Sequence, residues 1–318
     1  MTKIHSLARK KSCPKRTLMY FINGKRITRL LMYLFLLDLV FVFLYPFLYM
    51  LITSVKSPED IMDVTVHWLV NGIHGQNYTL SWNVLDYPTR LVRTFMVVTL
   101  CTLGHLIACS FLGYGFARYN FRGKKLLFLL LLLSIIVPPQ TIITPVYMIF
   151  SNAHMTGTYL PLILPTWFGL GLKGGLFIFI FRQFYLSLPR SLEEASSIDG
   201  CGPISTFFRI ALPSSRSSIM VCLVLSLVWH WNDYFEPTIY ITQQKDYLLP
   251  MMLPGLYNLM NGAGTVTDVA ASVDLNLIYT EAVAMAATTL VIIPVFILYM
   301  FLQKQFIEGV ERSGITGE

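Results

Sequence analysis

Residues 126–150 read LLFLLLLLSIIVPPQTIITPVYMIF, a run that contains no charged side chain. No Asp, Glu, Lys or Arg occurs anywhere between Lys125 and Lys173. A helix that crosses a bilayer needs about 20 mostly apolar residues. The stretch therefore predicts membrane-spanning helices rather than the amphipathic helices of a soluble domain.

The whole chain shares this character. Of its 318 residues, 55% are hydrophobic and 13% are charged, whereas a soluble domain carries about 25% charged residues. The mean hydropathy of +0.60 agrees. This composition excludes an ordinary cytosolic enzyme, a disordered protein and a secreted disulfide scaffold.

Six apolar runs are long enough to cross a bilayer, at about 30–55, 94–117, 126–150, 159–181, 217–242 and 277–302. They predict an all-α, polytopic membrane protein with a six-helix bundle over 30–302. A basic arm, 1–29, precedes the bundle, and a tail, 303–318, follows it. The first run is too long for the 7–15-residue core of a signal peptide and has no A-x-A-like site after it, so we expect a retained anchor.

The positive charges are distributed unevenly between the predicted loops. Nineteen of the 24 Lys and Arg residues fall in 1–29, 118–125, 182–216 and the tail. Because cytoplasmic loops carry an excess of Lys and Arg, both termini and the 182–216 loop are predicted to be cytoplasmic. The net charge of +7 is thus a topology signal, and no nucleic-acid partner is expected.

The cytoplasmic loop contains the most informative local pattern. Residues 188–203 read LPRSLEEASSIDGCGP, which predicts a short helix, a turn and a second helix. Ser191 and Glu194 have the S-x-x-E spacing of a capping box. Gly200 and Gly202 are expected to end the first helix, and Pro203 suits the first turn of the next.

The first of these short helices carries a small apolar face outside the membrane. Leu192, Ala195 and Ile198 recur at intervals of three residues. Such a face can dock into a groove of another protein or pack against its own bundle. The pattern alone leaves both alternatives open.

This loop resembles the EAA loop of binding-protein-dependent ABC importer permeases, which runs roughly P-x-x-L-x-E-A-A-x-I-D-G-A and then I-x-L-P. Ser196 and Cys201 stand where that pattern usually has Ala, and both are small enough for tight packing. The matching positions are Pro189, Leu192, Glu194, Ala195, Ile198, Asp199, Gly200, Ile210, Leu212 and Pro213.

The resemblance extends over nearly the whole chain. Within the family, the chain is similar to the second permease of maltose-type carbohydrate systems. It is carried further by 114–124, 138–140, 181–184, 231–232 and 305–309. It implies a subunit of the bacterial cell membrane that forms half of the translocation pathway for a sugar or oligosaccharide. It assigns coupling to an ATPase to Leu192, Glu194, Ala195, Ile198, Asp199 and Gly200.

The chain lacks the phosphate-binding pattern G-x-x-x-x-G-K-[ST]. No catalytic residue, cofactor site or metal site is therefore expected in it. The resemblance implies that a separate pair of ATPase subunits binds ATP and magnesium. It also implies a second permease subunit and an extracytoplasmic sugar-binding protein as partners.

Charged residues inside apolar runs are functional-site hypotheses by default. Glu281 lies near the outer end of the sixth run and is expected to reach the interface. Asp38 lies within the first run, where structure and transport remain equal alternatives. Lys173 lies among four glycines that permit an unwound segment, which is tolerated where it lines a cavity or is buried in protein; these are Gly169, Gly171, Gly174 and Gly175. The alternative for Lys173 is close helix packing with an acidic partner.

Trp231 and Asn232 complete the candidate pathway with Asp38 and Lys173. Aromatic residues at this position can stack on a sugar, or they can belong to the interfacial belt of a span. His105 and His230 have no Cys, Asp or Glu at metal-ligand spacing.

The sequence permits comparison with three other functions. Within the same mechanism, the solute is instead another polar molecule such as glycerol phosphate. A self-sufficient secondary transporter would show internal repeats, and none is visible in the sequence. A membrane-embedded transferase would need clustered Asp or His at one membrane face, and the chain offers only Asp233 and Glu236.

Overall fold

The computed structural model describes residues 15–63, 68, 70–260 and 281–315. Every regular element within these ranges is a helix, as the apolar runs predict. The chain divides into two compact units, Met1–Ile52 and Thr53–Glu318.

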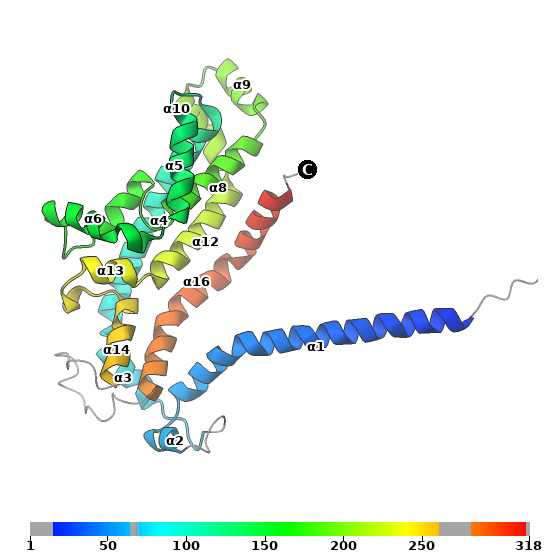
Figure 1. Cartoon of the computed structure of the whole chain (residues 1–318), viewed down its shortest axis with the longest axis vertical. Helices are drawn as coiled ribbons and strands as arrows, with labels where there is room; N and C mark the ends of the chain where they lie inside the picture. Colours follow the sequence, from blue (N-terminus) through cyan, green and yellow to red (C-terminus); the bar gives the residue numbers. More distant parts are fainter. Residues whose placement is uncertain (1–14, 64–67, 69, 261–280, 316–318) are drawn as a thin grey trace, which may run out of the picture. The chain divides into compact units, whose positions relative to one another are not determined.

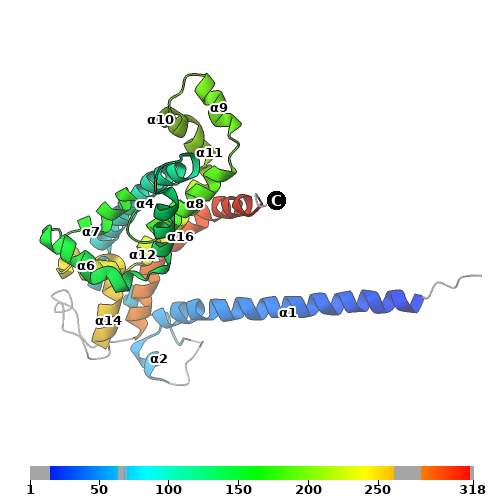
Figure 2. The same ribbon diagram turned by 45° about the horizontal axis from the view of Figure 1, so that its top comes forward.

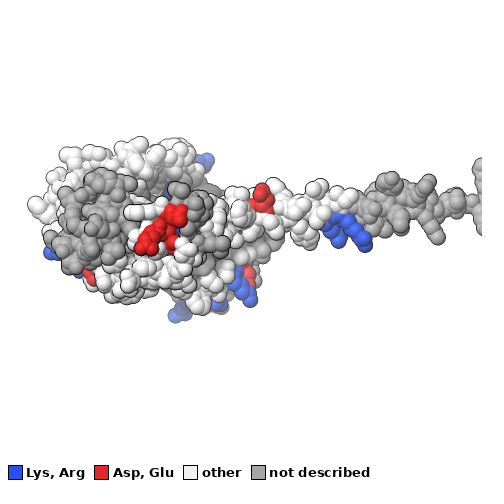
Figure 3. All heavy atoms as spheres, turned by 90° about the horizontal axis from the view of Figure 1, so that it is seen from below, with Lys and Arg blue, Asp and Glu red and all other residues white. Residues whose placement is uncertain are grey.

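The first unit is dominated by one long helix, α1, Lys15–Ser54 (Figure 1). Its segment Arg26–Ser54 is long and apolar enough to cross a membrane, in agreement with the first predicted run. In the coloured part of this helix in Figure 3, basic side chains lie at the end nearer its start, and uncharged residues cover most of the stretch that follows. The helix begins inside the predicted basic arm, so the later half of that arm is helical and leads into the span.

The second unit is built around α4, Tyr87–Arg118. This helix packs along α8, Gly174–Ser187, and α12, Arg216–Asn232, while α16, Glu281–Ile315, covers α12 (Figure 2). Close approach requires a small residue at Gly113, where an added Cβ would lie 2.6 Å from the Cβ of Phe181. Phe177, Phe181 and other buried residues of α8 fill the core beside it.

The third predicted run, 126–150, folds as two helices rather than one. α5, Lys124–Ile136, and α6, Pro139–Asn152, meet at an angle of 107°. The bend falls at Pro138 and Pro139, and proline both lacks an amide donor and clashes with the preceding turn.

The fourth and fifth runs are also broken. In 159–181, α7 (Leu160–Ile163) and the 3-10 helix η1 (Leu164–Phe168) precede an irregular segment before α8. In 217–242, α12 stops at Asn232, and Asp233 Oδ1 accepts hydrogen bonds from the amides of Phe235 (3.0 Å) and Glu236 (3.3 Å). These bonds begin α13, Phe235–Tyr240.

Three described helices are therefore long and apolar enough to span, or up to five if each bent pair counts as one. The six-span count is not confirmed in the described part of the chain. Glu281 lies in the first turn of α16, at the first described residue of the candidate span Glu281–Gly309, and residues 277–280 lie outside the described residues. A carboxylate in the first turn is favoured by the helix dipole.

Short helices lie within residues 56–93 and 243–276, which the charge pattern predicts to be outer segments, and within the 182–216 loop. The outer segments contain α2 (Pro58–Met62), α3 (Gln76–Val84), η3 (Gln244–Asp246), η4 (Leu249–Met251) and α14 (Met252–Met260). The loop contains α9 (Ser191–Ile198), α10 (Pro203–Thr206), the π-helical turn η2 (Phe207–Ala211) and α11 (Leu212–Ser214). α9 and α14 lie at opposite ends of the second unit (Figures 1 and 2).

Candidate coupling and translocation sites

The apolar face predicted on α9 is exposed. Ile198 is 86% exposed and Leu192 43% exposed, and Ala195 is exposed between them. Exposed apolar side chains on one helix face mark an interaction surface. Of the two alternatives left open by the sequence, this geometry favours docking to another protein over packing on the bundle.

Polar contacts hold the opposite side of α9. Ser196 is 3% exposed, and its hydroxyl lies 2.8 Å from that of Thr206 in α10. Glu193 Oε1 lies 2.7 Å from Arg118 Nε at the end of α4. The usual Ala at position 196 would lack the hydroxyl, so this chain adds a polar link where a small residue is expected.

The capping box predicted for α9 is wrong. The helix begins at Ser191, with Arg190 in the N-cap position and no side-chain capping bond, so Ser191 lies one residue too late to cap. The end of the helix is as predicted for Gly200, which has φ 80°. The Cys201 amide donates to the Ser196 carbonyl at 2.9 Å, the closure that follows a left-handed residue.

Gly202 differs from its prediction, because its backbone is extended, with φ −72° and ψ 167°. It caps the next helix instead of ending α9. Pro203 occupies the first turn of α10, as predicted.

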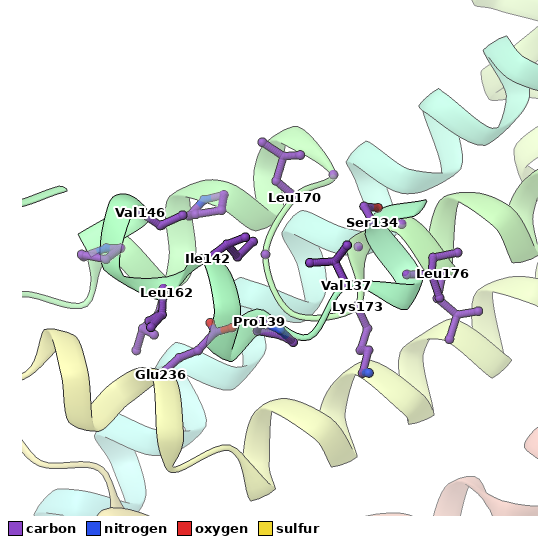
Figure 4. A pocket seen from close by; sticks show the side chains of 18 of the residues that line it. Ser134, Val137, Pro139, Ile142, Val146, Leu162, Leu170, Lys173, Leu176 and Glu236 are labelled. Carbon is purple, nitrogen blue, oxygen red and sulfur yellow. The ribbon is translucent and has the colours of Figure 1, made fainter. Parts of the chain in front are cut away.

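A cavity of about 580 Å³ lies beside the broken fourth run. Its walls come from α5, α6, the segment 169–175, α8 and α13, and they are mostly apolar. Lys173 and Glu236 are the charged residues that line it. Figure 4 shows Glu236 reaching in from α13 and the Lys173 side chain extending toward α12.

The unwound segment predicted around Lys173 is present. Gly169, Gly171 and Lys173 have φ values of 71°, 80° and 63°, in the left-handed region that favours glycine. Gly174 is required for packing, because an added Cβ would meet the Gly169 carbonyl. The cavity and the close packing that the sequence offered as alternatives therefore occur together.

The acidic partner considered for Lys173 is not found among the described residues. Its side chain is exposed, and its Nζ lies 5.9 Å from the centre of the Trp229 ring. That distance is within the range of a cation–π interaction.

Trp231 and Asn232, which were also predicted to line the pathway, are not brought to this cavity. Trp231 is 5% exposed, and its indole Nε1 donates to the Val291 carbonyl in α16 at 3.1 Å. Asn232 donates to the Val228 carbonyl of its own helix at 2.9 Å. Asp38 belongs to α1, in the other unit, where its side chain is exposed. The helical period turns Trp231 toward α16, so it packs there instead of lining the cavity.

Sequence reasoning missed a contact between two histidines, buried His105 and half-buried His230. His105 is 1% exposed, and its Nδ1 lies 3.2 Å from His230 Nε2. Its Nε2 lies 2.9 Å from the Leu170 carbonyl, so the pair joins α4 and α12 to the unwound segment. Ionisable residues inside apolar runs were the available signal. No group of three or more possible metal ligands occurs in the described ranges.

Broken apolar helices beside a cavity, together with an exposed short helix, α9, are the features of a multi-pass membrane permease. Residues 109–312 match the family described as "Binding-protein-dependent transport system inner membrane component", and the chain belongs to this family of ABC importer permeases. The resemblance seen in the EAA-type loop is thereby confirmed.

Curated relatives align along most of the chain. The arabinooligosaccharides transport system permease protein AraQ of Bacillus subtilis (strain 168) is 27% identical over 292 residues, covering 91% of this chain and 96% of its own. The probable ABC transporter permease protein PH1036 of Pyrococcus horikoshii is 29% identical over 270 residues, 84% of this chain and 90% of its own. The sn-glycerol-3-phosphate transport system permease protein UgpE of Yersinia enterocolitica is 25% identical over 281 residues, 86% and 92%.

A solved structure shares the fold. It belongs to a bacterial ABC transporter involved in the import of the acidic polysaccharide alginate, and it is 20% identical with a TM-score of 0.73. The match covers 89% of this chain and 98% of that one.

Proposed function

We propose that this chain forms half of the translocation pathway of an importer for a sugar or oligosaccharide, and that α9 couples it to a separate ATPase. The observation that carries the proposal is the exposed apolar face of Leu192, Ala195 and Ile198. That face lies on a helix whose opposite side is held to the protein by polar contacts. A helix held in this way can transmit a push from its partner.

The proposed division of labour follows from the sequence. Because the chain has no phosphate-binding loop, two partner ATPase subunits would bind ATP and magnesium. A second permease subunit would supply the other half of the pathway, and an extracytoplasmic binding protein would deliver the solute. Both termini and the 182–216 loop would be cytoplasmic. Thiol labelling of Ser214→Cys tests this orientation, because Ser214 is exposed. Labelling of this cysteine from outside intact cells would contradict the orientation.

Glu194 is proposed to pair with a basic residue of the ATPase. Its carboxylate is exposed, and the wrong capping prediction removes the alternative role within α9. Asp199 and Gly200 would set the end of the helix beside it. We expect Glu194→Gln to weaken ATPase binding, since glutamine keeps the shape and loses the charge.

Two solute classes are supported by different observations. A sugar is supported by relatives named for arabinooligosaccharides and for polygalacturonan and rhamnogalacturonan. An anionic solute such as glycerol phosphate is supported by UgpE and by Lys173, a cation at the cavity without an acidic partner in the described chain.

The test is uptake by proteoliposomes that contain the chain, the second permease, the ATPase and the binding protein of its own system. Neutral oligosaccharides, galacturonan oligomers and glycerol phosphate are compared at equal concentration. The chain alone is expected to hydrolyse no ATP, and the complete set is expected to accumulate one solute class in an ATP-dependent way. Robust ATP turnover by the purified chain alone would contradict the division of labour.

The docking face is tested by Ile198→Asp. Altering a hot-spot residue costs about 2 kcal/mol or more, so the affinity of the ATPase for the chain, followed by co-purification, should fall at least about tenfold. Ile198→Leu is the matched control and should retain the ATPase. Equal recovery of the ATPase with Asp and Leu would exclude this face as the docking site.

A further inference from the structure

The two ends of α4 are each anchored by a buried arginine. The helix contains 32 residues without an internal break, which corresponds to about 48 Å at 1.5 Å per residue. Its first turns lie near the outer segment 243–252, and its last residue lies beside α9. The first turns of α4 thus contact a predicted outer segment, and its last residue contacts the predicted cytoplasmic loop.

At the inner end, Arg118 contacts two parts of the coupling loop. Its Nε lies 2.7 Å from Glu193 Oε1, and its Nη2 donates to the Leu188 carbonyl at 2.7 Å. The Arg118 side chain is 6% exposed and that of Glu193 is 23% exposed. An arginine buried to this extent is costly to leave without its partner.

At the outer end, Arg90 is 3% exposed and contacts the turn that follows α13. Its Nη1 donates to the carbonyls of Gln244 (2.9 Å) and Tyr247 (3.1 Å). Thr94, one turn further, accepts a hydrogen bond from the Leu249 amide at 2.8 Å. Three contacts from one helix face therefore fix this turn.

The body of α4 between the anchors is tightly packed. Gly113 brings it against the backbone of α8, where an added Cβ would lie 3.0 Å from the Arg182 amide. Closely packed interiors transmit displacement rather than absorb it. An unbroken, packed helix therefore moves as one body.

We propose that Arg118 and Glu193 are positioning residues that fix α9 to α4, so that a displacement of α9 is carried along α4 to the outer 244–249 turn. The inference rests on the proposed function, because the displacement originates in an ATPase bound to α9. Arg90 is the corresponding anchor at the outer end.

The test separates coupling from assembly. Arg118→Gln and Glu193→Gln are assembled with the partner subunits, and the solute transported per ATP hydrolysed is measured in proteoliposomes. We expect the ATPase to remain bound and to hydrolyse ATP, while the transport ratio falls at least about fivefold, the lower range of typical coupling between sites. Arg90→Met should lower the same ratio from the other end.

Two variants provide matched comparisons. The exchange Arg118→Glu with Glu193→Arg restores opposite charges and should recover part of the lost ratio. Arg122→Gln removes a positive charge at an exposed site in the 118–125 loop. This variant should leave the ratio unchanged. Rescue by the exchanged pair is a result that a general loss of stability would not produce.

A second readout follows the outer turn directly. Gln243 is exposed, and a fluorophore on Gln243→Cys can be placed in a chain carrying Cys13→Ser and Cys201→Ser, which retains the three buried thiols. ATP should change its emission in the parent complex and not in the Glu193→Gln complex.

Three results would overturn the inference. In the first, Arg118→Gln and Glu193→Gln transport at the parental ratio with the ATPase bound. In the second, Glu193→Gln releases the ATPase, which would make Glu193 a docking residue. In the third, the fluorophore responds equally in parent and variant. A parent complex that neither binds the ATPase nor transports would instead contradict the proposed function itself.

Discussion

The helix α4 and the stretch from α7 to α8 arise from apolar runs of similar length but fold differently. The run 94–117 lies within one helix that extends from Tyr87 to Arg118. The run 159–181 forms a short helix, a 3-10 turn, an unwound segment and only then α8. Hydropathy treats the two runs alike, so overall apolarity does not decide whether a span is continuous.

Glycine and proline account for the difference. Gly169 and Gly171 adopt positive φ, and Pro161 and Pro165 cannot donate to a preceding turn. In α4, Gly113 and Gly104 serve instead for close approach to neighbouring helices. One region is therefore suited to transmit movement and the other to line a cavity.

Gly113→Leu should disrupt the continuous region most strongly. Its Cβ would lie 2.6 Å from the Phe181 Cβ and 3.1 Å from the Ile178 carbonyl, and backbone atoms cannot move aside cheaply. We expect a loss of about 3 kcal/mol from overpacking, measured as a lower Tm in detergent by size-exclusion after heating. Gly115→Ala is the control, because its Cβ would have no neighbour within 4 Å. A parental Tm for Gly113→Leu would show that α4 and α8 can separate.

Gly171→Ala should strain the broken region without a clash. An added Cβ would lie 3.5 Å from Pro165 and Thr166 atoms, an ordinary contact, so the cost comes from φ 80°. A side chain in this region costs about 1–2 kcal/mol. The same melting assay should show the loss, while Gly72→Ala, where an added Cβ would meet nothing within 4 Å and φ is not positive, should melt like the parent. No change for Gly171→Ala would mean that the segment can adopt another backbone.

Gly200→Val applies the same strain to the exposed coupling loop. Its Cβ would meet nothing within 4 Å, so the cost of about 1 kcal/mol or slightly more is conformational and confined to the end of α9. We expect normal membrane insertion with reduced uptake, and either uncoupled ATP hydrolysis or release of the ATPase. Gly202→Val, at φ −72°, should behave like the parent. Parental uptake by Gly200→Val with the ATPase bound would remove the coupling role of this loop.

Lys173 permits the finest comparison. Lys173→Gly and Lys173→Ala both remove the ammonium group and its contact with Trp229. Only glycine relieves the strain of φ 63°, so it should be more stable than alanine by about 1 kcal/mol. The difference between their Tm values measures the strain directly. Equal Tm values for the glycine and alanine variants would show that the backbone at residue 173 is not strained.

Much of the EAA-type loop could be predicted from local sequence. Gly200 and Pro203 occupy the expected backbone positions because positive φ and a first-turn proline are local preferences. Ser191 shows the limit of such reasoning, since its spacing to Glu194 suits a capping box but the helix begins one residue earlier than that box requires. The contacts of Arg118 with Glu193 and Leu188 join residues about 70 positions apart, and no local pattern encodes them.

The candidate pathway was harder to predict. Lys173 lies at the cavity, and its glycine neighbours gave sufficient warning of the unwound segment. Trp231 has equally suggestive surroundings in the sequence, yet its indole is directed to Val291. In the sequence, Glu236 is half of an isolated acidic pair with Asp233. It lines the cavity because α12 ends at Asn232 and α13 turns back toward α6.

The membrane class, the helical secondary structure and the EAA-type loop can be predicted from local sequence, because apolar length, charge asymmetry and backbone preferences act over a few neighbouring residues. Only the tertiary structure decided which apolar runs stay straight, which side chains line the cavity, and that Arg118 and Arg90 anchor opposite ends of α4. Those outcomes depend on which helix packs against which, and the free energy of such packing belongs to pairs of surfaces rather than to either segment alone.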